Sequence, residues 1–492
     1  MTTTLSSGQA ATATASPRAM ARAGGLHPFG VFVLLAGAFL PIMDFFITNV
    51  ALPSIDASLH ASASSLELVI AGYGVAYATL LVLGGRLGDR YGRHRMFLGG
   101  LVGFVLASLA CGVAPSVGAL IAARIVQGAT AALLIPQVLA TFHHVLEGER
   151  KSRAVALYGA TSGIAAVVGQ LAGGLLVSAD IAGTSWRPIF LVNVPIGVVV
   201  ILVAARIVPS TRSPHPVGID LPGTVLFAAT LTALLVPLTE GHSLGWPWWT
   251  WLLLAVAVVL GAATYLVEKR TEQRGEVPLL PPSLLRLPSM SRGLAMVFAF
   301  SIGFGAFMFV FALTVQNGLH ADALHSGLAI LPMALLFFAG SLVAPRMITR
   351  YGRAALSTGA VIQLAGLASL VTILVGNWPH VSLWAMALPL ALIGAGQSML
   401  FAGLFRSVLA DVPAHLGGIG SGVLITLQQS GLALGVATLG TLYLTLAPHN
   451  IARAFAGVEY VQMAIVALLA VGAAALPRFT KAASAATPVV EA

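Results

Sequence analysis

Two charged side chains stand inside long apolar stretches of this sequence. Asp44 lies within LPIMDFFITNVALP, residues 40–53, and Arg124 lies within AARIVQGATAALLIP. A charge at the centre of a bilayer costs about 2.5–3.5 kcal/mol on insertion scales, so intramembrane charges usually serve a function. A buried acid near an arginine can load and release a proton when its access to water changes. The alternative is a static salt bridge that fixes two helices.

Both residues lie at matched depth. Asp44 and Arg124 are each seven positions from the end of an apolar stretch that we place at the same membrane surface. At 1.5 Å per residue, both side chains lie about 10 Å below that surface. They are the only charges that we place well inside the hydrocarbon region. We therefore expect a direct contact, a bridging water or at least a shared cavity.

The elements that carry these residues are membrane-spanning helices. Of the 492 residues, 58% are hydrophobic and 8% are charged, whereas a soluble domain is about 25% charged. Continuously apolar runs of about 20 residues predict helices rather than a barrel of alternating strands. The sequence predicts an all-α polytopic membrane protein with spans at 28–51, 66–87, 96–113, 117–141, 154–178, 188–207, 221–239, 249–268, 293–316, 324–345, 355–375, 381–405, 417–446 and 457–477.

Charge and tryptophan positions predict the orientation. With an even number of spans both termini lie on one side, and all but three of the 25 Lys and Arg residues then fall on that side, the exceptions being Arg124, Arg187 and Arg453. The positive-inside rule makes that side cytoplasmic. The seven tryptophans fall on the opposite side, as an aromatic belt would. The net charge of +9 thus reflects topology, and we expect no nucleic-acid partner.

The chain divides into two halves around a polar linker. RYGR occurs in GGRLGDRYGRHRMF (84–97) and again in APRMITRYGRAALS (344–357), in each case after a helix pair, which indicates repeated halves. We predict a disordered cytoplasmic tail at 1–27, a six-helix bundle at 28–207, an inserted helix pair at 208–268, a linker at 269–292, a second six-helix bundle at 293–477 and a tail at 478–492.

Two glycine-rich motifs predict close helix packing. In GGRLGDRYGR the glycines permit a sharp turn, and the charges can pair with neighbouring helix ends as a conformational latch; the residues concerned are Gly85, Asp89, Arg90, Gly92 and Arg93. The fifth span carries small residues four apart, which let membrane helices approach closely, at Gly159, Gly163, Gly169, Gly173 and Gly174.

Polar and aromatic side chains inside the spans are candidates for a substrate pocket. A tyrosine hydroxyl or a glutamine facing lipid would lack a partner, so these residues should face the interior. A stripe of phenylalanines on the ninth span could line a pocket or face lipid. The candidates are Asn49, Tyr73, Tyr77, Gln127, Phe300, Phe304, Phe307, Gln428 and Gln429.

Enzymatic functions have little support. The sequence contains no G-x-S-x-G, H-E-x-x-H or Walker A motif, and its histidines are not accompanied by other residues that could be metal ligands. We therefore expect no catalytic residues, no metal site and no cofactor, with a proton gradient as the energy source.

Four motifs together resemble the major facilitator superfamily, and more closely its fourteen-span drug:proton antiporter branch, the QacA/EmrB-like group. They are MDFFITNVALP, GGRLGDRYGR, ARIVQG and SWRPIFLVNVPIG. The resemblance covers residues 28–477. It implies that Asp44 and Arg124 take part in proton coupling, that the loop motif stabilises one alternating-access state, and that the glycine motif is characteristic of antiporters. The fifth-span motif departs from the family at Gln170, where proline is usual, and the second RYGR copy has Thr349 in place of aspartate.

The resemblance implies an exporter of lipophilic small molecules in the bacterial cytoplasmic membrane, functional as a monomer, with protons and the lipid bilayer as its other partners. A dedicated exporter of one metabolite or antibiotic is the alternative within the same class. A membrane sensor or scaffold that transports nothing is the alternative from another class.

Overall fold

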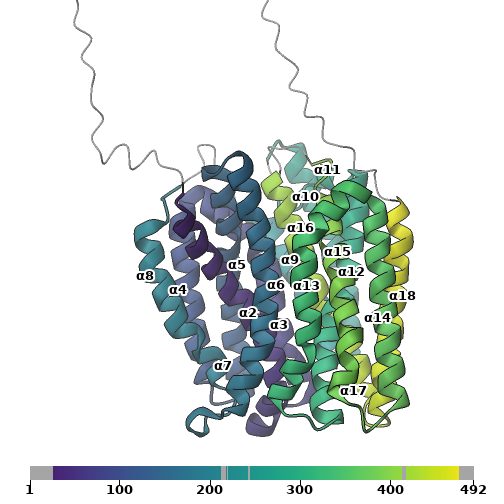
Figure 1. Cartoon of the computed structure of the whole chain (residues 1–492). Helices are drawn as coiled ribbons and strands as arrows, with labels where there is room; N and C mark the ends of the chain where they lie inside the picture. The colour runs from purple at the N-terminus through teal and green to yellow at the C-terminus, as the bar shows by residue number, and fades with distance from the viewer. Residues whose placement is uncertain are drawn as a thin grey trace, which may run out of the picture.

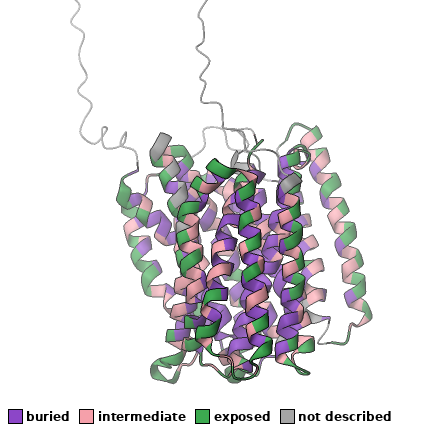
Figure 2. Ribbon diagram, turned by 45° about the vertical axis from the view of Figure 1, so that its right-hand side comes forward, coloured by how far each residue is buried: buried purple, intermediate pink, exposed green. Residues whose placement is uncertain are grey.

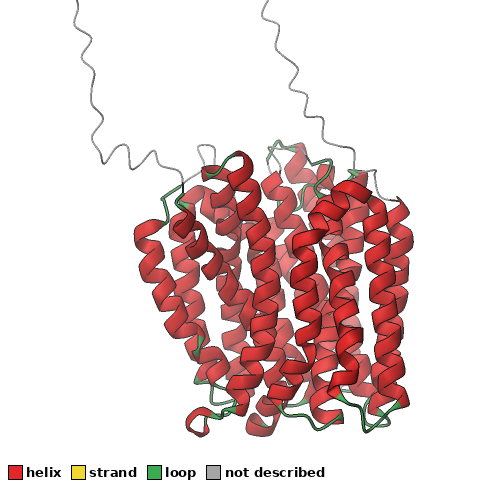
Figure 3. Cartoon of the chain, viewed as in Figure 1, coloured by secondary structure: helices red, strands yellow, loops and turns green. Residues whose placement is uncertain are grey.

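The computed structural model describes residues 26–211, 218, 220–241, 244–276, 278–412 and 417–475. These residues form helices joined by short loops, and no strand occurs among them (Figure 3). Most of both predicted tails lies outside the described residues. Leu26 and His27 belong to the fold rather than to a tail, because Leu26 is buried and the His27 ring accepts a hydrogen bond from the backbone N–H of Phe29.

The first half of the chain forms one bundle, on the left of Figure 1. It contains α2 (Pro28–Leu59), α3 (Ala63–Tyr91), α4 (Arg93–Gly112), α5 (Val117–Val145), α6 (Gly148–Ser178), the short turn η1 (Ile181–Gly183), α7 (Pro188–Leu191) and α8 (Asn193–Ile207). Prolines at positions 41 and 53 of α2 and 136 of α5 lie inside their helices.

The inserted pair is α9 (Leu221–Glu240) and α10 (Trp248–Gln273), and the linker contains α11 (Pro282–Leu285). The second bundle contains α12 (Pro288–Leu313), the π-helical turn η2 (Thr314–Gly318), α13 (Ala323–Tyr351), α14 (Arg353–Gly376), η3 (Leu383–Met386), α15 (Ala387–Val408), α16 (Gly417–Gly435), the π-helical turn η5 (Val436–Gly440), α17 (Thr441–Leu446) and α18 (Ile451–Ala475). Fourteen helices in the described residues are long and apolar enough to span a membrane, as the sequence predicts.

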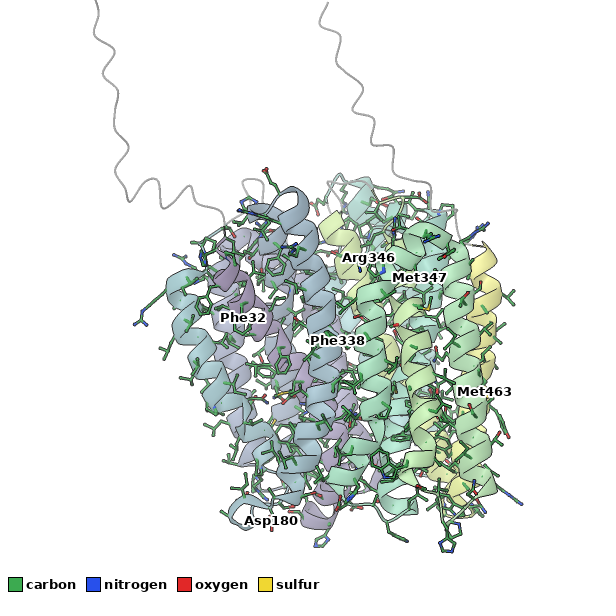
Figure 4. The ribbon with its side chains drawn as sticks, in the orientation of Figure 1. Phe32, Asp180, Phe338, Arg346, Met347 and Met463 are labelled. Atoms are coloured by element: carbon green, nitrogen blue, oxygen red, sulfur yellow. The ribbon has the colours of Figure 1, made fainter. Side chains whose placement is uncertain are left out.

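The helix bundle has two faces, which we name by the chain ends. The terminal face carries the start of α2 and the end of α18, at the top of Figure 1, and the opposite face carries the α6–α7 connection and α17. In Figure 4, Asp180 lies at the opposite face and Arg346 lies toward the terminal face. Residues that are exposed lie mostly on the outer helices and at the two faces, and buried residues predominate in the middle (Figure 2).

Glycine brings α3 and α5 into backbone contact. A Cβ atom on Gly84 would collide with the carbonyl oxygen of Ala132, and one on Gly128 would collide with the carbonyl oxygen of Tyr73. Only glycine permits such an approach, which is the usual way that membrane helices pack closely. This packing fixes the depth of α5 relative to α3, and with it the position of Arg124.

The two halves meet at the opposite face. The Gln316 side chain donates a 3.0 Å hydrogen bond to the Val50 carbonyl, and the backbone N–H of Leu324 donates to the Ser178 hydroxyl at 3.1 Å. Gly174 of α6 abuts the backbone of α13 at Ala323. These contacts close the space between the halves at that face.

The inserted pair covers one seam between the halves, where α3 packs against α16. Phe227 and Leu231 of α9 pack against α3, and Leu235 packs against Ala433 and Ala437 of the second half. In α10 only 17% of the most apolar stretch is buried in the protein, against 72% in α2, so α10 is peripheral.

The pair is attached at the terminal face by Arg86 of α3. Its guanidinium donates to the carbonyl of Gly218 at 3.1 Å and to that of Pro278. Gly218 precedes the helix pair in the chain and Pro278 follows it. The Asp220 carboxylate in turn accepts from the backbone N–H of Leu279 at 3.0 Å. The insertion is therefore bound to the first half at both of its ends.

We predict opposite effects of alanine at two glycines. Gly84→Ala should destabilise the protein by about 1–3 kcal/mol because the new methyl group overpacks the α3–α5 contact. Gly99→Ala in α4 should stabilise it by up to about 1 kcal/mol through helix propensity, since no atom lies within 4 Å of that Cβ position. Thermal unfolding in detergent measures both. Equal melting temperatures for the two variants would contradict the packing argument.

Candidate functional site

Asp44 is fully buried and is hydrogen-bonded by three side chains. One carboxylate oxygen accepts from the Arg124 guanidinium, with which Asp44 forms a direct ion pair. The other accepts from the side-chain amides of Gln127 at 2.9 Å and Asn193 at 2.7 Å. The partners come from α5 and α8, so the network joins three helices of the first half. The expected proximity of Asp44 and Arg124 is therefore a direct contact.

Arg124 is also held from several sides. Its Nε donates to the Val69 carbonyl of α3 at 3.0 Å, and its Nη1 donates to the Gln127 side-chain oxygen at 2.7 Å. The guanidinium carbon lies 4.3 Å from the centre of the Tyr73 ring and 5.7 Å from that of Phe190. Such cation–π contacts stabilise a desolvated guanidinium by about 2 kcal/mol.

This network supplies most of the support that a buried ion pair requires, with Nη2 of Arg124 the one guanidinium nitrogen that has no hydrogen-bond partner among the described residues. Removing two charges from water costs several kcal/mol per ion, and mutual attraction offsets that cost only with good geometry and additional hydrogen bonds. Gln127 supplies part of that support, because its amide nitrogen also donates to Ser108 at 2.9 Å. The sequence predicts that Gln127 lines a substrate pocket, but its side chain lies in the ionic network instead.

A cavity of about 420 Å³ lies between the two halves. It is lined by residues of α2, α3, α5, α6, α12, α13, α15 and α16, most of them apolar. The predicted site residues that it brings together are Tyr73, Tyr77, Gly159, Gly163, Phe304, Gln428 and Gln429. His143 and Arg406, which are exposed near the terminal-face ends of α5 and α15, also line it. The cavity therefore extends toward the terminal face.

Tyr73 separates this cavity from the ionic network. Its hydroxyl donates to the Pro41 carbonyl at 3.0 Å, and its ring lies over Arg124. Tyr73, Pro41 and Phe45 line the cavity, whereas Asp44 does not. One layer of side chains thus stands between the buried acid and the space that could hold a molecule.

Three other candidates do not line the cavity. Asn49 is buried and donates to the carbonyl of Phe45 one turn back in its own helix at 3.0 Å. Phe300 and Phe307 are buried in the core, and Phe300 stacks on Phe304 with ring centres 6.2 Å apart. Burial excludes the lipid-facing alternative for both of these phenylalanines.

The loop motif forms a tight connection between α3 and α4. Gly92 has φ of +104°, a conformation that favours glycine, and Arg93 donates to Asp89 at 2.7 Å across it. The backbone N–H of Arg93 also donates to the Thr211 carbonyl, after α8, at 2.9 Å. Arg90 stacks on Tyr91, and Gly85 lies against Pro136. Apart from the contact with Thr211, which precedes the inserted pair, these contacts lie within the first half.

The glycines of α6 divide by position. Those in the half of the helix near the opposite face pack on backbone, with Gly169 and Gly173 against Met43 and Ile47 of α2. Gly163 lies against the Phe337 ring of α13, and a Cβ on Gly159 would meet no atom within 4 Å. The motif thus packs α6 against α2 and α13 at the closed face. Where α6 lines the cavity, Gly159 leaves space beside the helix.

Three buried polar residues were missed from the sequence. Asn193 lies in a motif that we recognised, yet its contact with Asp44 could not be derived from that motif. Glu67 is 1% exposed and accepts from Thr441 of the second half at 3.1 Å. Glu459 is fully buried, and α18 begins at Ile451, six residues before the predicted start, so the acid lies further inside its helix than the sequence predicts.

Trp186 also departs from the prediction. It is completely buried, packed edge-on against Phe190 and with the Arg187 guanidinium 4.8 Å from its ring, so it is not part of a lipid-facing aromatic belt. Trp248, Trp251 and Trp384 are exposed near the opposite face, as a belt requires.

A family model for the Major Facilitator Superfamily matches residues 34–436. The chain belongs to this superfamily. Solved structures agree on the fold: a transporter of the POT family has a TM-score of 0.66 at 14% identity, with 91% of this chain and 97% of that chain covered.

Curated relatives cover most of this transporter. A probable actinorhodin transporter of Streptomyces coelicolor is 36% identical over 84% of this chain and 71% of its own. The puromycin resistance protein of Streptomyces alboniger is 36% identical, with 84% and 81% covered. A putative multidrug resistance protein of Salmonella typhi is 29% identical, with 84% and 85% covered.

We predict strong coupling between Asp44 and Arg124 in stability. Asp44→Asn and Arg124→Gln should each cost about 3–5 kcal/mol, because each leaves an uncompensated charge buried. The double variant should cost much less than the sum, since neither charge then remains. A double-mutant cycle on unfolding in detergent measures the interaction energy. Additive losses would show that the ion pair does not act as a unit.

Proposed function

We propose that this protein is a proton-coupled antiporter that exports lipophilic small molecules across the bacterial cytoplasmic membrane. Its two relatives from Streptomyces are named for transport of, or resistance to, one antibiotic each, and that from Salmonella for multidrug resistance. The terminal face is cytoplasmic in this proposal, supported by the positive charges that gather there.

The observation that carries the proposal is the position of Asp44 relative to the cavity. A carboxylate surrounded by a guanidinium and two amides lies one side chain behind a pocket of drug-sized volume. Proton and substrate can therefore bind at adjacent but distinct places. Movement of Tyr73 or α2 would alter both sites together, which is the arrangement that exchange of one for the other requires.

In this proposal the structure corresponds to the state that takes up substrate. Contacts between the halves close the opposite face, and the cavity extends to His143 and Arg406 near the terminal face. With the terminal face in the cytoplasm, a lipophilic molecule enters from inside. Rocking of the halves then opens the other face, as alternating access describes.

The cavity itself favours aromatic and apolar cargo. Phe304, Phe337 and Phe401 line it, while Gln428 and Gln429 supply amide groups for orientation. A dedicated exporter of one antibiotic remains an alternative, favoured by those relatives that are named for single antibiotics. The cargo is moved without chemical change in either case.

We expect Asp44→Asn to abolish substrate-linked proton flux, because the amide cannot carry the proton. Proteoliposomes with an imposed pH gradient and a pH-sensitive dye would be offered a panel of lipophilic cations and neutral drugs. Wild type should show proton flux with some members of the panel, and the flux of the variant should be lower by about tenfold or more. Substrate binding to the variant, measured by fluorescence, should persist, because Asp44 does not line the cavity.

Asp322→Asn is the matched control. Asp322 is an exposed acid at the opposite face, and the backbone N–H of His325 donates to it and holds the pKa of that carboxyl below its usual value. Asparagine also caps helices well, so α13 should be unaffected. Equal flux in wild type and Asp44→Asn would assign Asp44 a structural role and defeat the antiporter mechanism.

A further inference from the structure

A buried acid in the second half has no partner for its carboxyl group. Glu459 is the ninth residue of α18 and is completely buried. Neither of its carboxyl oxygens has a hydrogen-bond partner among the described residues. A carboxylate without such partners costs far more to bury than a neutral acid does. Glu459 therefore differs from Asp44, whose carboxylate accepts hydrogen bonds from three side chains.

The depth of Glu459 follows from the packing of α18 against α12. Gln462 packs on Gly303 of α12, and Ile451, nearer the opposite face, packs on Gly318 of η2. Glu459 lies between these two contacts along α18. At 1.5 Å per residue it is about 12 Å from the end of α18 at the opposite face. The acid therefore lies well inside the membrane-spanning part of the second half.

Gln462 offers this acid an acceptor. It lies three residues after Glu459, on the neighbouring turn of the same helix face, and is 2% exposed. Met463, the next residue, lies between the two faces of the bundle in Figure 4. The side-chain oxygen of Gln462 also has no hydrogen-bond partner among the described residues. A proton on Glu459 supplies the missing donor, because a protonated carboxyl group donates one hydrogen bond and a carboxylate donates none.

The charged groups around α18 are too distant to compensate a carboxylate at Glu459. The elements that pack against α18 are α12, α14, α17 and η2, and their titratable side chains are Arg292, Arg353 and Tyr443. Arg292 is the fifth residue of α12 and Arg353 the first of α14, both toward the terminal face and about 20 Å or more from the level of Glu459. On α18 itself, Arg453 and Tyr460 are exposed. A proton makes the acid neutral without a counter-charge.

The repeated halves give this position a counterpart. α8 and α18 belong to the sixth spans of the two bundles, and each packs against the first helix of its own bundle, α2 or α12. In the first half Asn193 of α8 donates to Asp44 of α2. In the second half α12 has no acid, and the carboxyl group belongs to α18 instead. Each half thus has a buried acid where its first and sixth spans meet, but Asp44 has Arg124 as a partner.

The π-helical turn η2 covers the route from the opposite face to this acid. It packs on the start of α18 through Gly318, and its Gln316 side chain donates to the Val50 carbonyl of the first half at 3.0 Å. Separation of the halves at this face would break that bond and free η2 to move away from α18. Water would then reach the end of the α12–α18 contact that lies nearest to Glu459.

We infer that Glu459 is a proton-binding site of the second half. Its carboxyl group is protonated while the opposite face is closed, donates to Gln462, and exchanges its proton with the outside when η2 moves. The inference rests on the proposed function, which makes the opposite face the outer one. Because Asp44 is ionised beside Arg124 in the same conformation, the two halves hold acids in different protonation states.

Infrared spectroscopy detects this proton, because the C=O stretch of a carboxylic acid lies apart from those of amides and carboxylates. Purified protein in detergent at neutral pH, without substrate, should show an acid band that Glu459→Gln removes. Glu276→Gln is the matched control, the same substitution at an exposed glutamate in the linker, and should remove no band. Identical spectra of wild type and Glu459→Gln would mean that Glu459 is ionised and would overturn the inference. An acid band that appears only when sodium is withdrawn would make a metal cation the ligand, with the same consequence.

Gln462→Leu tests the hydrogen bond, and it keeps the inference testable if Glu459→Gln fails to fold. Loss of the acceptor should move the acid band to higher frequency, because a C=O group in a carboxyl that donates no hydrogen bond vibrates faster. An unchanged band in Gln462→Leu would show that the proton is not on Glu459 beside this amide, and would overturn the inference.

Transfer into heavy water tests the route through η2, since the band shifts as deuterium replaces the proton. In wild type this shift should be much slower than mixing. Gln316→Ala should accelerate it about fivefold, the equivalent of one neutral hydrogen bond between the halves. A complete shift of the wild-type band on mixing, or an unchanged rate in Gln316→Ala, would overturn the assigned route.

These spectra need no substrate, so their outcome is independent of the flux assay. Loss of flux in Asp44→Asn together with identical spectra of wild type and Glu459→Gln would remove only the site at Glu459. An acid band that depends on Glu459, together with full flux in Asp44→Asn, would remove only Asp44 as the coupling acid.

Discussion

The ion pair of Asp44 and Arg124 imposes a constraint on the whole first half of the molecule. Two charges withdrawn from water are tolerated only where additional donors and acceptors form hydrogen bonds with them. Gln127, Asn193 and the Val69 carbonyl supply them, from α5, α8 and α3. The four helices must therefore meet at one depth, and the backbone contacts at glycines 84 and 128 allow them to do so.

The network is sealed from the cavity rather than open to it. Tyr73 contacts both the network and the cavity, since its ring lies over Arg124 and it is also one of the residues that line the cavity. A sealed acid cannot exchange a proton until a side chain or helix moves. The same movement changes the shape of the pocket, so the physical basis of exchange lies in that single layer of residues.

The contacts between the halves combine hydrogen bonds with close packing of α6 on α13 and of α3 on α16. Hydrogen bonds from Gln316 and Thr441, together with the glycine contacts of α6, close one face. In the proposed alternating-access cycle these contacts would break and form again while each half keeps its own packing.

Much of the architecture could be predicted because the bilayer acts on the sequence directly. Spans follow from the length of apolar runs, and Asp44 and Arg124 stand out because a charge in hydrocarbon is costly. Side-chain direction could not be predicted in the same way. Gln127 and Phe304 looked equally suited to a pocket, yet the first lies in the ionic network and the second lines the cavity.

The sequence by itself determined the number of spans, the two halves and the two intramembrane charges, Asp44 and Arg124, that are expected to lie close together. Those properties depend on composition along one helix at a time. Tertiary structure decided which amides contact the pair, that Trp186 is buried, and that Glu67 contacts Thr441 of the other half. Each of these depends on the rotation and depth of one helix against another, which are set by packing between residues far apart in the chain.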